Sequence, residues 1–341
     1  MRIAIGHKIQ KGPWGGGNNF AKSIVSHLQQ NGHEVFFDLK RKDLDVILIT
    51  DPRPRNPAVS FNISDVFRYK VFQNKRVKVF HRINECDERK GTKLLNFRLR
   101  NANAVADHTI FVASWLRGLR VWNHDSVYSV ILNGADTNFF NRIGKSAQIN
   151  GRKIKIVTHH WGGHLNKGFD IYKYLDEMLE KNIWSDKFEF TYIGNLPRNF
   201  SFKNVTVVSP LQGIELGEEL KKHDVYLTAS LNEPAGMHHV EGALCGLPIL
   251  YRNSGALPEY CENYGVGFHG KIDFQDSLNT LVKNYKKHAK SMINYPNTEK
   301  KMVQEYEALF NNSLLELNQT QNIRFSYNFL KSFLISQLLI F

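Results

Sequence analysis

The sequence predicts an α/β protein of two domains, each built on a parallel β-sheet with helices on its faces. Short apolar segments typical of buried strands alternate with loops and with segments of helical spacing. This alternation stops in a polar stretch at residues 141–152 and resumes at residue 154. A length of 341 residues also suits two domains. We therefore expect domains at residues 1–146 and 147–324, with a ligand site in a cleft between them.

The first domain opens with a strand, a loop, a helix and a second strand, the order typical of a parallel sheet. The first strand is expected at residues 2–5, and residues 20–30 have helical spacing that ends at Asn31 and Gly32. Further strands are expected at residues 34–37, 46–50, 77–80, 109–113 and 127–132.

The loop after the first strand contains Gly15, Gly16, Gly17 and Asn18. Glycines that lead into a helix N-terminus allow a phosphate or a sugar to approach the backbone closely. A dinucleotide site would need a third glycine where Phe20 stands, so NAD binding is disfavoured. A plain flexible loop would have the same composition, and that alternative stays open.

A polar segment at residues 81–92 follows the expected strand 77–80. In open α/β sheets, ligands bind at the carboxyl ends of the strands. We therefore expect His81 and Arg82, the first residues of this segment, to face a ligand.

The second domain repeats the strand and helix alternation. Strands are expected at residues 154–158, 188–193, 205–208, 225–229 and 248–251, and a helix at residues 169–181. Between the last two strands, Glu233 lies in a loop, and a compact helix that contains Glu241 ends at Gly246.

Composition narrows the possible partners. The formal charge of +13 favours polyanions, such as diphosphate substrates or anionic membrane surfaces. The basic residues are scattered and lack the features of a nucleic-acid module, so no nucleic acid is expected. Three cysteines without a C-x-x-C pair argue for a reducing compartment. With no signal peptide and no apolar run of spanning length, we expect a cytoplasmic protein, with membrane association left open.

A metal site is not expected. The histidines at positions 159, 160, 164, 238 and 239 lack the cysteine or glutamate companions of a zinc site. Asp43 and Asp45 form a D-x-D pair, but the pair precedes an expected strand and is interpreted as a turn.

In this order of motifs the chain resembles glycosyltransferases of the GT-B fold, and is similar to the retaining enzymes of family 4. The resemblance is densest at Glu233-x7-Glu241, with Gly246-Leu-Pro248, Gly255 and Pro258-Glu259 after it. Supporting motifs are Gly15–Gly17, Asn133-Gly134-x-Asp136 and Lys167-Gly168. The resemblance implies two Rossmann-like, doubly wound domains that face each other across a cleft.

The resemblance also implies roles. The donor is a nucleotide-diphosphate sugar, and the acceptor a glycan or a lipid-linked molecule of polysaccharide or glycolipid biosynthesis. Lys167, Glu233 and His81 become the candidate catalytic residues. Candidate substrate-binding residues are Gly16, Gly17, Asn18, Arg82, Ala235, Gly236, Met237 and Glu241. Lys167 and the backbone N–H groups at the start of the helix suit a diphosphate, so no metal or other cofactor is required.

Two departures from the family pattern leave alternatives open. Family members carry an arginine shortly before the phosphate-binding lysine, where this chain has residues 161–164, Trp-Gly-Gly-His. Arg82 or Arg89 could supply that charge. A nucleotide-sugar 2-epimerase and a non-catalytic binder of sugar nucleotides or polyanions are the competing functions. Finally, residues 325–341 form a helical stripe, expected to pack back on the first domain or to lie on a membrane.

Overall fold

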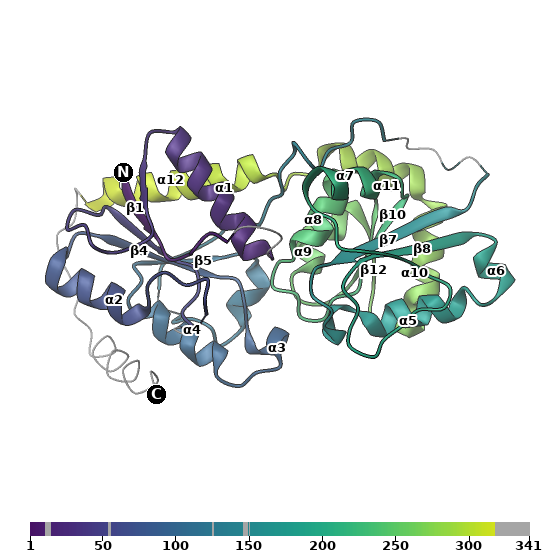
Figure 1. Cartoon of the computed structure of the whole chain (residues 1–341), viewed down its shortest axis with the longest axis horizontal. Coiled ribbons are helices and arrows are strands. Elements are labelled where there is room, and N and C mark those ends of the chain that lie inside the picture. Colours follow the sequence, from purple (N-terminus) through teal and green to yellow (C-terminus); the bar gives the residue numbers. More distant parts are fainter. Residues whose placement is uncertain (11–14, 54–55, 125, 146–148, 150, 318–341) are drawn as a thin grey trace. The chain divides into compact units, whose positions relative to one another are not determined.

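The computed structural model describes residues 1–10, 15–53, 56–124, 126–145, 149 and 151–317, and it divides into two compact units (Figure 1). Unit 1 comprises Met1–Leu132 and the chain from Met302, and unit 2 comprises Asn133–Lys301. The boundary therefore lies earlier than the expected one at residue 146. The last strand of unit 1 ends at Val130, and the backbone N–H of Asn133 already donates to the Tyr260 hydroxyl of unit 2 at 2.7 Å.

Unit 1 contains a six-stranded parallel sheet in the order β2-β1-β3-β4-β5-β6. Its strands are β1 (Arg2–Ile5), β2 (Glu34–Phe36), β3 (Val46–Ile49), β4 (Lys78–Ile83), β5 (His108–Phe111) and β6 (Tyr128–Val130). Its helices are α1 (Gly16–Gln30), α2 (Ile63–Arg68), α3 (Asp87–Lys90), α4 (Leu95–Asn103) and α12 (Glu299–Leu317), with single turns η1 (Tyr69–Gln73) and η2 (Ser114–Gly118).

Both faces of this sheet are buried, because successive side chains of a strand point to opposite faces. Ile3 and Ile5 of β1 belong to the core under α1 and α12, whereas Ala4 belongs to the core under α2. Figure 1 shows α1 and α12 on one side of the sheet and α2 and α4 on the other. The predicted doubly wound α/β class is confirmed for this unit.

The return helix α12 completes the core of unit 1. The ring centroids of Tyr306 and Phe20 lie 5.1 Å apart, and those of Phe310 and Phe80 lie 4.7 Å apart. The sequence predicted a return helix at residues 325–341 instead, a segment outside the described residues. In the described chain, residues 299–317 make the return.

Unit 2 contains a second six-stranded parallel sheet in the order β12-β11-β10-β7-β8-β9. Its strands are β7 (Ile154–His160), β8 (Phe188–Gly194), β9 (Thr206–Val208), β10 (Val225–Thr228), β11 (Ile249–Arg252) and β12 (Gly265–Phe268). Its helices are α5 (Phe169–Met178), α6 (Asn182–Ser185), α7 (Gly213–Lys221), α8 (Met237–Leu244), α9 (Leu257–Cys261), α10 (Lys271–Lys283) and α11 (Tyr285–Ser291), with single turns η3 (Leu165–Lys167), η4 (Glu262–Tyr264) and η5 (Met292–Asn294).

The segment that enters unit 2 and the segment that leaves it are joined by backbone hydrogen bonds. Ala135 and Thr298 form a parallel bridge, and the backbone N–H of Glu299 donates to the Ala135 carbonyl at 2.9 Å. Gly134 leaves no room for a side chain, because a Cβ there would overlap the Thr298 carbonyl. The outgoing and returning segments therefore lie in direct backbone contact.

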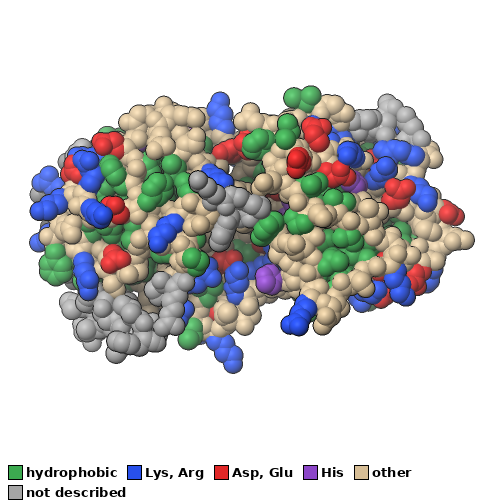
Figure 2. All heavy atoms as spheres, in the orientation of Figure 1, with side chains coloured by type: hydrophobic (Ala, Val, Ile, Leu, Met, Phe, Trp, Pro, Cys, Tyr) green, Lys and Arg blue, Asp and Glu red, His purple; other side chains and the backbone are tan. Residues whose placement is uncertain are grey.

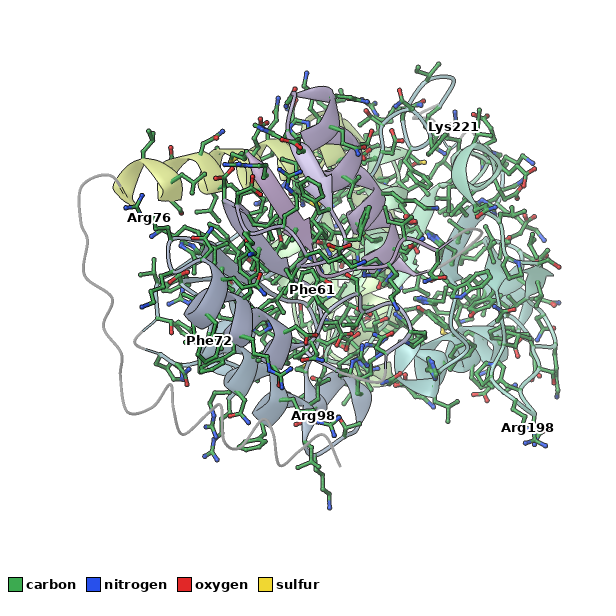
Figure 3. The ribbon with its side chains drawn as sticks, turned by 60° about the vertical axis from the view of Figure 1, so that its left-hand side comes forward. Phe61, Phe72, Arg76, Arg98, Arg198 and Lys221 are labelled. Atoms are coloured by element: carbon green, nitrogen blue, oxygen red, sulfur yellow. The ribbon has the colours of Figure 1, made fainter. Side chains whose placement is uncertain are left out.

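Lys and Arg side chains are interspersed with Asp and Glu on the visible face of each unit (Figure 2). Labelled cations such as Arg76, Arg98, Arg198 and Lys221 lie on different elements (Figure 3). The excess positive charge on the visible face is therefore dispersed. Among the described helices, none combines the length and the apolar composition that a bilayer crossing requires.

Candidate functional site

The best-developed candidate site lies in unit 2, where β10 leads into α8. All four residues of β10 are buried, and the chain leaves the carboxyl edge of the sheet in a loop that ends at Gly236, the N-cap of α8. Glu233 of this loop and Glu241 of α8 are 5% and 7% exposed. Carboxylates buried to this degree need polar partners, and both have them.

Glu233 is paired with Lys167. Its Oε2 atom lies 3.1 Å from Nζ of Lys167, the last residue of η3. The two loops also share a backbone hydrogen bond, in which Leu231 N–H donates to the Asn166 carbonyl at 2.9 Å. The structure thus brings together two of the three residues that the sequence proposed as catalytic.

Gly255, in the loop after β11, fixes the backbone at Glu233. Its φ of +61° is in the left-handed region, and a Cβ there would lie 2.5 Å from both N and O of Glu233. The next residue, Ala256, donates its N–H to the Glu233 carbonyl at 2.8 Å. Glycine is therefore required at position 255 because the backbone there is in close contact with the loop that contains Glu233.

Glu241 is held by a histidine from a neighbouring strand. Nε2 of His159, on β7, lies 2.7 Å from Oε2 of Glu241, and Nδ1 lies 3.0 Å from the Tyr226 hydroxyl of β10. Gly242 brings α8 close, because a Cβ there would overlap the Tyr226 ring. The result is a chain of three buried side chains from three elements.

Three more histidines, His160, His238 and His239, pack next to these three side chains. His160 Nε2 lies 2.7 Å from the Tyr172 hydroxyl, and His238 Nε2 lies 2.9 Å from Oγ1 of Thr228. Burial lowers the pKa of His239 to about 3 and the pKa of His238 well below its usual value. These last two imidazoles are therefore neutral at pH 7. Within the described residues, no group of three His, Cys, Asp or Glu side chains is placed to hold a metal ion.

Ala235, Gly236 and Met237 lie at the start of α8 as expected, with Met237 the first helical residue. The Ala235 carbonyl accepts a hydrogen bond from Nδ2 of Asn133 at 3.0 Å. This contact gives the Asn133-Gly134 motif a role in unit 2 that the sequence did not indicate.

The polar segment was expected to begin after a strand at residues 77–80, and for His81 and Arg82 this expectation was wrong. β4 continues to Ile83, so both residues belong to the strand and are almost fully buried. Neighbours on a strand point to opposite faces. The Arg82 guanidinium lies 3.9 Å from the centre of the Phe20 ring, under α1, and burial lowers the pKa of His81 to about 3. The cation–π contact favours the burial of the Arg82 side chain inside the strand.

The Gly-rich segment of unit 1 belongs to α1. Gly16 and Gly17 form its first turn, and no described residue lies within 4 Å of where a Gly15 Cβ would be. Asn18 is buried, and its side-chain amide both accepts from Gln10 N–H at 2.8 Å and donates to the Gln10 carbonyl at 3.1 Å. The Asn18 amide is therefore engaged with the backbone of Gln10, and its contact with a substrate stays a prediction.

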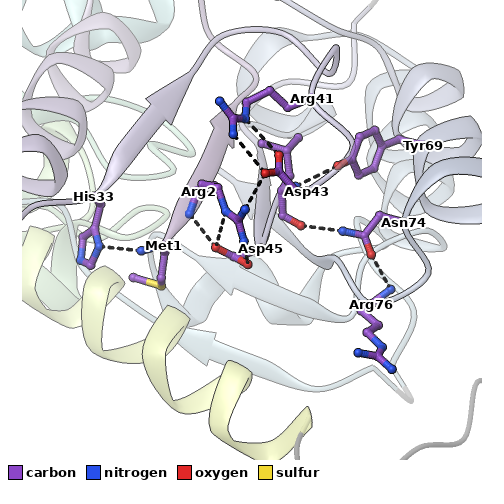
Figure 4. A network of polar contacts seen from close by, with 10 residues as sticks. Met1, Arg2, His33, Arg41, Asp43, Asp45, Tyr69, Asn74 and Arg76 are labelled. Carbon is purple, nitrogen blue, oxygen red and sulfur yellow. Dashed lines mark hydrogen bonds and ion pairs between the residues drawn. The ribbon is translucent and has the colours of Figure 1, made fainter.

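The D-x-D pair is a structural ion-pair network. Asp43 bonds both Arg2 and Arg41, and Asp45 accepts the backbone N–H of Arg2 at 2.7 Å (Figure 4). The Arg41 hydrogen bond outweighs desolvation and, together with Arg2, lowers the pKa of Asp43 to about 2. Both acids precede β3, at the amino edge of the sheet, which agrees with their interpretation as a turn.

The sequence did not reveal that His159 pairs with Glu241 or that the Tyr226 hydroxyl contacts His159. A signal was present, since His159 and His160 end a strand at the carboxyl edge of the sheet. Which of two adjacent histidines reaches a given acid depends on the strand register, and that register was not available from the residues alone.

Comparison with known structures defines the fold as GT-B. Sucrose-phosphate synthase from Thermosynechococcus elongatus superimposes with a TM-score of 0.66 at 11% identity, covering 92% of this chain and 99% of that one. The catalytic domain of starch synthase IV from Arabidopsis thaliana, bound to ADP and acarbose, gives 0.67 at 11% identity, with 92% and 99% covered. HepE from Anabaena, in complex with UDP and glucose, gives 0.61 at 13% identity, with 91% and 99% covered.

A family model matches the site-bearing segment. Residues 201–300 match the family described as glycosyl transferases group 1, and this span contains Glu233, Glu241 and Gly255. A comparison with curated protein sequences finds no match. The resemblance to GT-B glycosyltransferases that the sequence indicated is thus confirmed.

Proposed function

We propose that this protein is a family 4 glycosyltransferase that moves a hexose from a nucleotide-diphosphate sugar to a glycan or lipid-linked acceptor. The observation that carries the proposal is the arrangement at the N-terminus of α8. A buried carboxylate paired with a lysine precedes the helix, and a second buried carboxylate lies inside it. This arrangement falls mainly in the segment that matches glycosyl transferases group 1.

In this proposal α8 and Lys167 bind the diphosphate. The first N–H groups of a helix have no intrahelical acceptors, and with the helix dipole they favour an anion. When the glycosidic bond breaks, negative charge grows on the nucleoside diphosphate, and donors already in place stabilise it. The complexes of starch synthase IV with ADP and of HepE with UDP and glucose support a nucleotide-sugar donor.

Glu241 would accept hydrogen bonds from the ribose hydroxyls, and Glu233 would contact the transferred sugar. The Glu233–Lys167 ion pair places a cation beside the carboxylate. Lys167 can then serve a diphosphate while Glu233 orients the sugar. With a lysine and a helix N-terminus for the diphosphate, we propose that the transfer needs no metal.

We further propose retention at the anomeric carbon. The acceptor hydroxyl would attack on the face from which the diphosphate leaves, and the leaving phosphate would take the acceptor proton. This scheme needs no separate general base in unit 2.

The proposal is tested with purified protein and a panel of UDP-, GDP- and ADP-sugars. We expect slow release of nucleoside diphosphate from at least one donor, unchanged by EDTA, and a product whose anomeric proton retains the donor configuration by NMR. Failure to bind any of these donors would exclude a glycosyltransferase. An inverted linkage from an α-linked donor would exclude the retaining mechanism alone.

Glu241→Ala tests the donor site directly. Losing hydrogen bonds to a charged acceptor costs about 1.5–3 kcal/mol, so we expect donor affinity to fall about 10- to 100-fold. Glu177→Ala, at an exposed acid on α5 of the same unit, is the matched control and should leave affinity unchanged. Equal losses in both variants would contradict the assigned role of Glu241.

One observation favours a second candidate, a non-catalytic binder of sugar nucleotides. The charge of Lys167 is shared with Glu233, and glycines occupy the region where the family carries an arginine. Binding of a donor with neither hydrolysis nor transfer to any acceptor would support this candidate over the enzyme.

A further inference from the structure

We propose that His159 is a positioning residue that holds Glu241 for recognition of the donor ribose. The inference rests on the proposed function and deepens it, because it explains how one carboxylate is kept ready for two ribose hydroxyls. It starts from a geometric fact. Both ring nitrogens of His159 are engaged, Nε2 with Glu241 at 2.7 Å and Nδ1 with the Tyr226 hydroxyl at 3.0 Å.

The hydrogen-bond network ties both ring nitrogens of His159 to neighbouring side chains. The Tyr226 hydroxyl accepts the backbone N–H of His159 at 3.2 Å, and its oxygen lies 3.0 Å from Nδ1 and 3.5 Å from the His159 carbonyl oxygen. Burial raises the pKa of Tyr226 well above its usual value, so the hydroxyl keeps its proton. With Nδ1 at the Tyr226 hydroxyl, Nε2 faces Glu241, where a ring N–H donates to the carboxylate.

In this arrangement only one oxygen of the Glu241 carboxylate makes a hydrogen bond within the described residues. His159 satisfies Oε2, whereas Oε1 makes no hydrogen bond within the described part of the chain. The Glu241 side chain is 10% exposed, so it is accessible but too buried to turn freely. A carboxylate fixed through one oxygen presents the other in a defined direction, as a pair of ribose hydroxyls requires.

His159 is suited to positioning Glu241 because it lies on a strand of the central sheet. It lies on β7 beside β10, and Tyr226 of β10 pairs in register with Val157. Gly242 lets α8 pack directly on the Tyr226 ring, which sets the height of Glu241 above the sheet. With both nitrogens engaged, His159 acts on a substrate only through Glu241.

The test compares nucleoside diphosphates with and without a ribose hydroxyl. Full-length protein is titrated calorimetrically with UDP, GDP and ADP, and the nucleotide that binds is compared with its 2′-deoxy and 3′-deoxy analogues. For wild type we expect the ribonucleotide to bind about 10- to 100-fold more tightly than at least one analogue, since hydrogen bonds to a charged acceptor are lost. If wild type binds none of the three nucleotides, the proposed function itself is overturned.

His159→Phe removes both hydrogen bonds and keeps a ring. We expect the ribonucleotide preference to fall to within about threefold, because Glu241 loses its fixed direction. His159→Gln keeps a donor near the Nε2 position and should retain most of the preference. Full preference in a folded His159→Phe protein, or equal loss of affinity for the ribonucleotide and its analogues, would overturn the inference and leave the proposed function standing.

His160→Gln is the matched control. His160 is the next residue of the same strand and is similarly buried, and its Nε2 lies 2.7 Å from the Tyr172 hydroxyl. We expect a lower melting temperature with an unchanged ribonucleotide preference. A fall in preference equal to that of His159→Phe would show that general disturbance of the site is sufficient, and would overturn the positioning role.

Discussion

At the scale of single residues, Gly255 combines two reasons for being glycine. Its φ is +61°, and a Cβ would meet the backbone of Glu233 at 2.5 Å. Gly91 has a similar φ of +64°, but no described residue lies within 4 Å of its Cβ position. A comparison of Gly91 with Gly255 therefore separates two contributions to stability, the strain of a left-handed residue with a side chain and the steric overlap of its Cβ.

We expect Gly91→Ala to cost about 1–2 kcal/mol of unfolding free energy, the price of a left-handed residue with a side chain. Gly255→Ala should cost about 2–5 kcal/mol, because overpacking adds about 1–3 kcal/mol. Donor affinity should fall only for Gly255→Ala, since Glu233 must shift. Urea unfolding and nucleotide titration measure both effects. Equal destabilisation of the two variants would mean that the backbone contact at Glu233 relaxes freely.

Candidate site residues were proposed where motifs of the chain resemble those of a known family. Glu233, Glu241 and Lys167 follow from motifs in the chain, and the structure places Lys167 beside Glu233. His159 was not predictable as the partner of Glu241, because that contact joins β7 to α8 across the fold. His81 and Arg82 were misplaced because polarity indicated a loop. Phe20, distant in sequence, provides the surface that lets Arg82 stay inside a strand.

At the scale of elements, α12 makes unit 1 depend on residues that come after unit 2. Phe310 is fully buried and its ring lies against Phe80, whereas Leu315 on the same helix is 66% exposed.

Phe310→Ala should destabilise unit 1 by about 3–5 kcal/mol through the lost burial and the cavity. Leu315→Ala should change stability by at most about 0.5 kcal/mol. Hydrogen exchange of β1 and β4 amides provides the readout, and unchanged protection in Phe310→Ala would show that α12 is dispensable.

Most strands were predictable from sequence, and helix limits were less so. A strand buried on both faces is a continuous apolar run, as in β3 and β10, and such runs stand out. The start of α1 was missed because Gly16 and Gly17 have poor helix propensity, yet they form its first turn. The return made by α12 was not predicted, because the stripe at residues 325–341 is more apolar than α12 and drew the prediction to itself; that segment lies outside the described residues.

At the scale of the whole molecule, buried neutral histidines make stability depend on pH. Burial lowers the pKa of His81, in unit 1, and of His239, in unit 2, from 6.5 to about 3. The unfolded chain therefore binds protons below pH 6.5 that the folded chain does not. Stability is fully present above pH 6.5 and is lost as the pH falls toward 3.

We expect unfolding free energy to fall below pH 6.5 by about 1.4 kcal/mol per pH unit for each such histidine. His239→Leu should reduce this slope in unit 2. His269→Leu, at a side chain that is 77% exposed, serves as the surface comparison. Urea unfolding at pH 7.5, 6.0 and 5.0 tests this. A slope for His239→Leu equal to that of wild type would mean that His239 takes up a proton without unfolding.

The late position of α12 also affects the order in which the protein becomes complete during synthesis. Domains generally fold as units while the chain is made, starting from the N-terminus. The sheet of unit 1 is finished at Val130, but Tyr306 and Phe310 emerge only after all of unit 2. Helix α1 covers part of this apolar face early, but the part that packs against Tyr306 and Phe310 stays exposed until α12 has been made. Transiently exposed apolar surface favours aggregation, and a contiguous first domain would not have this interval.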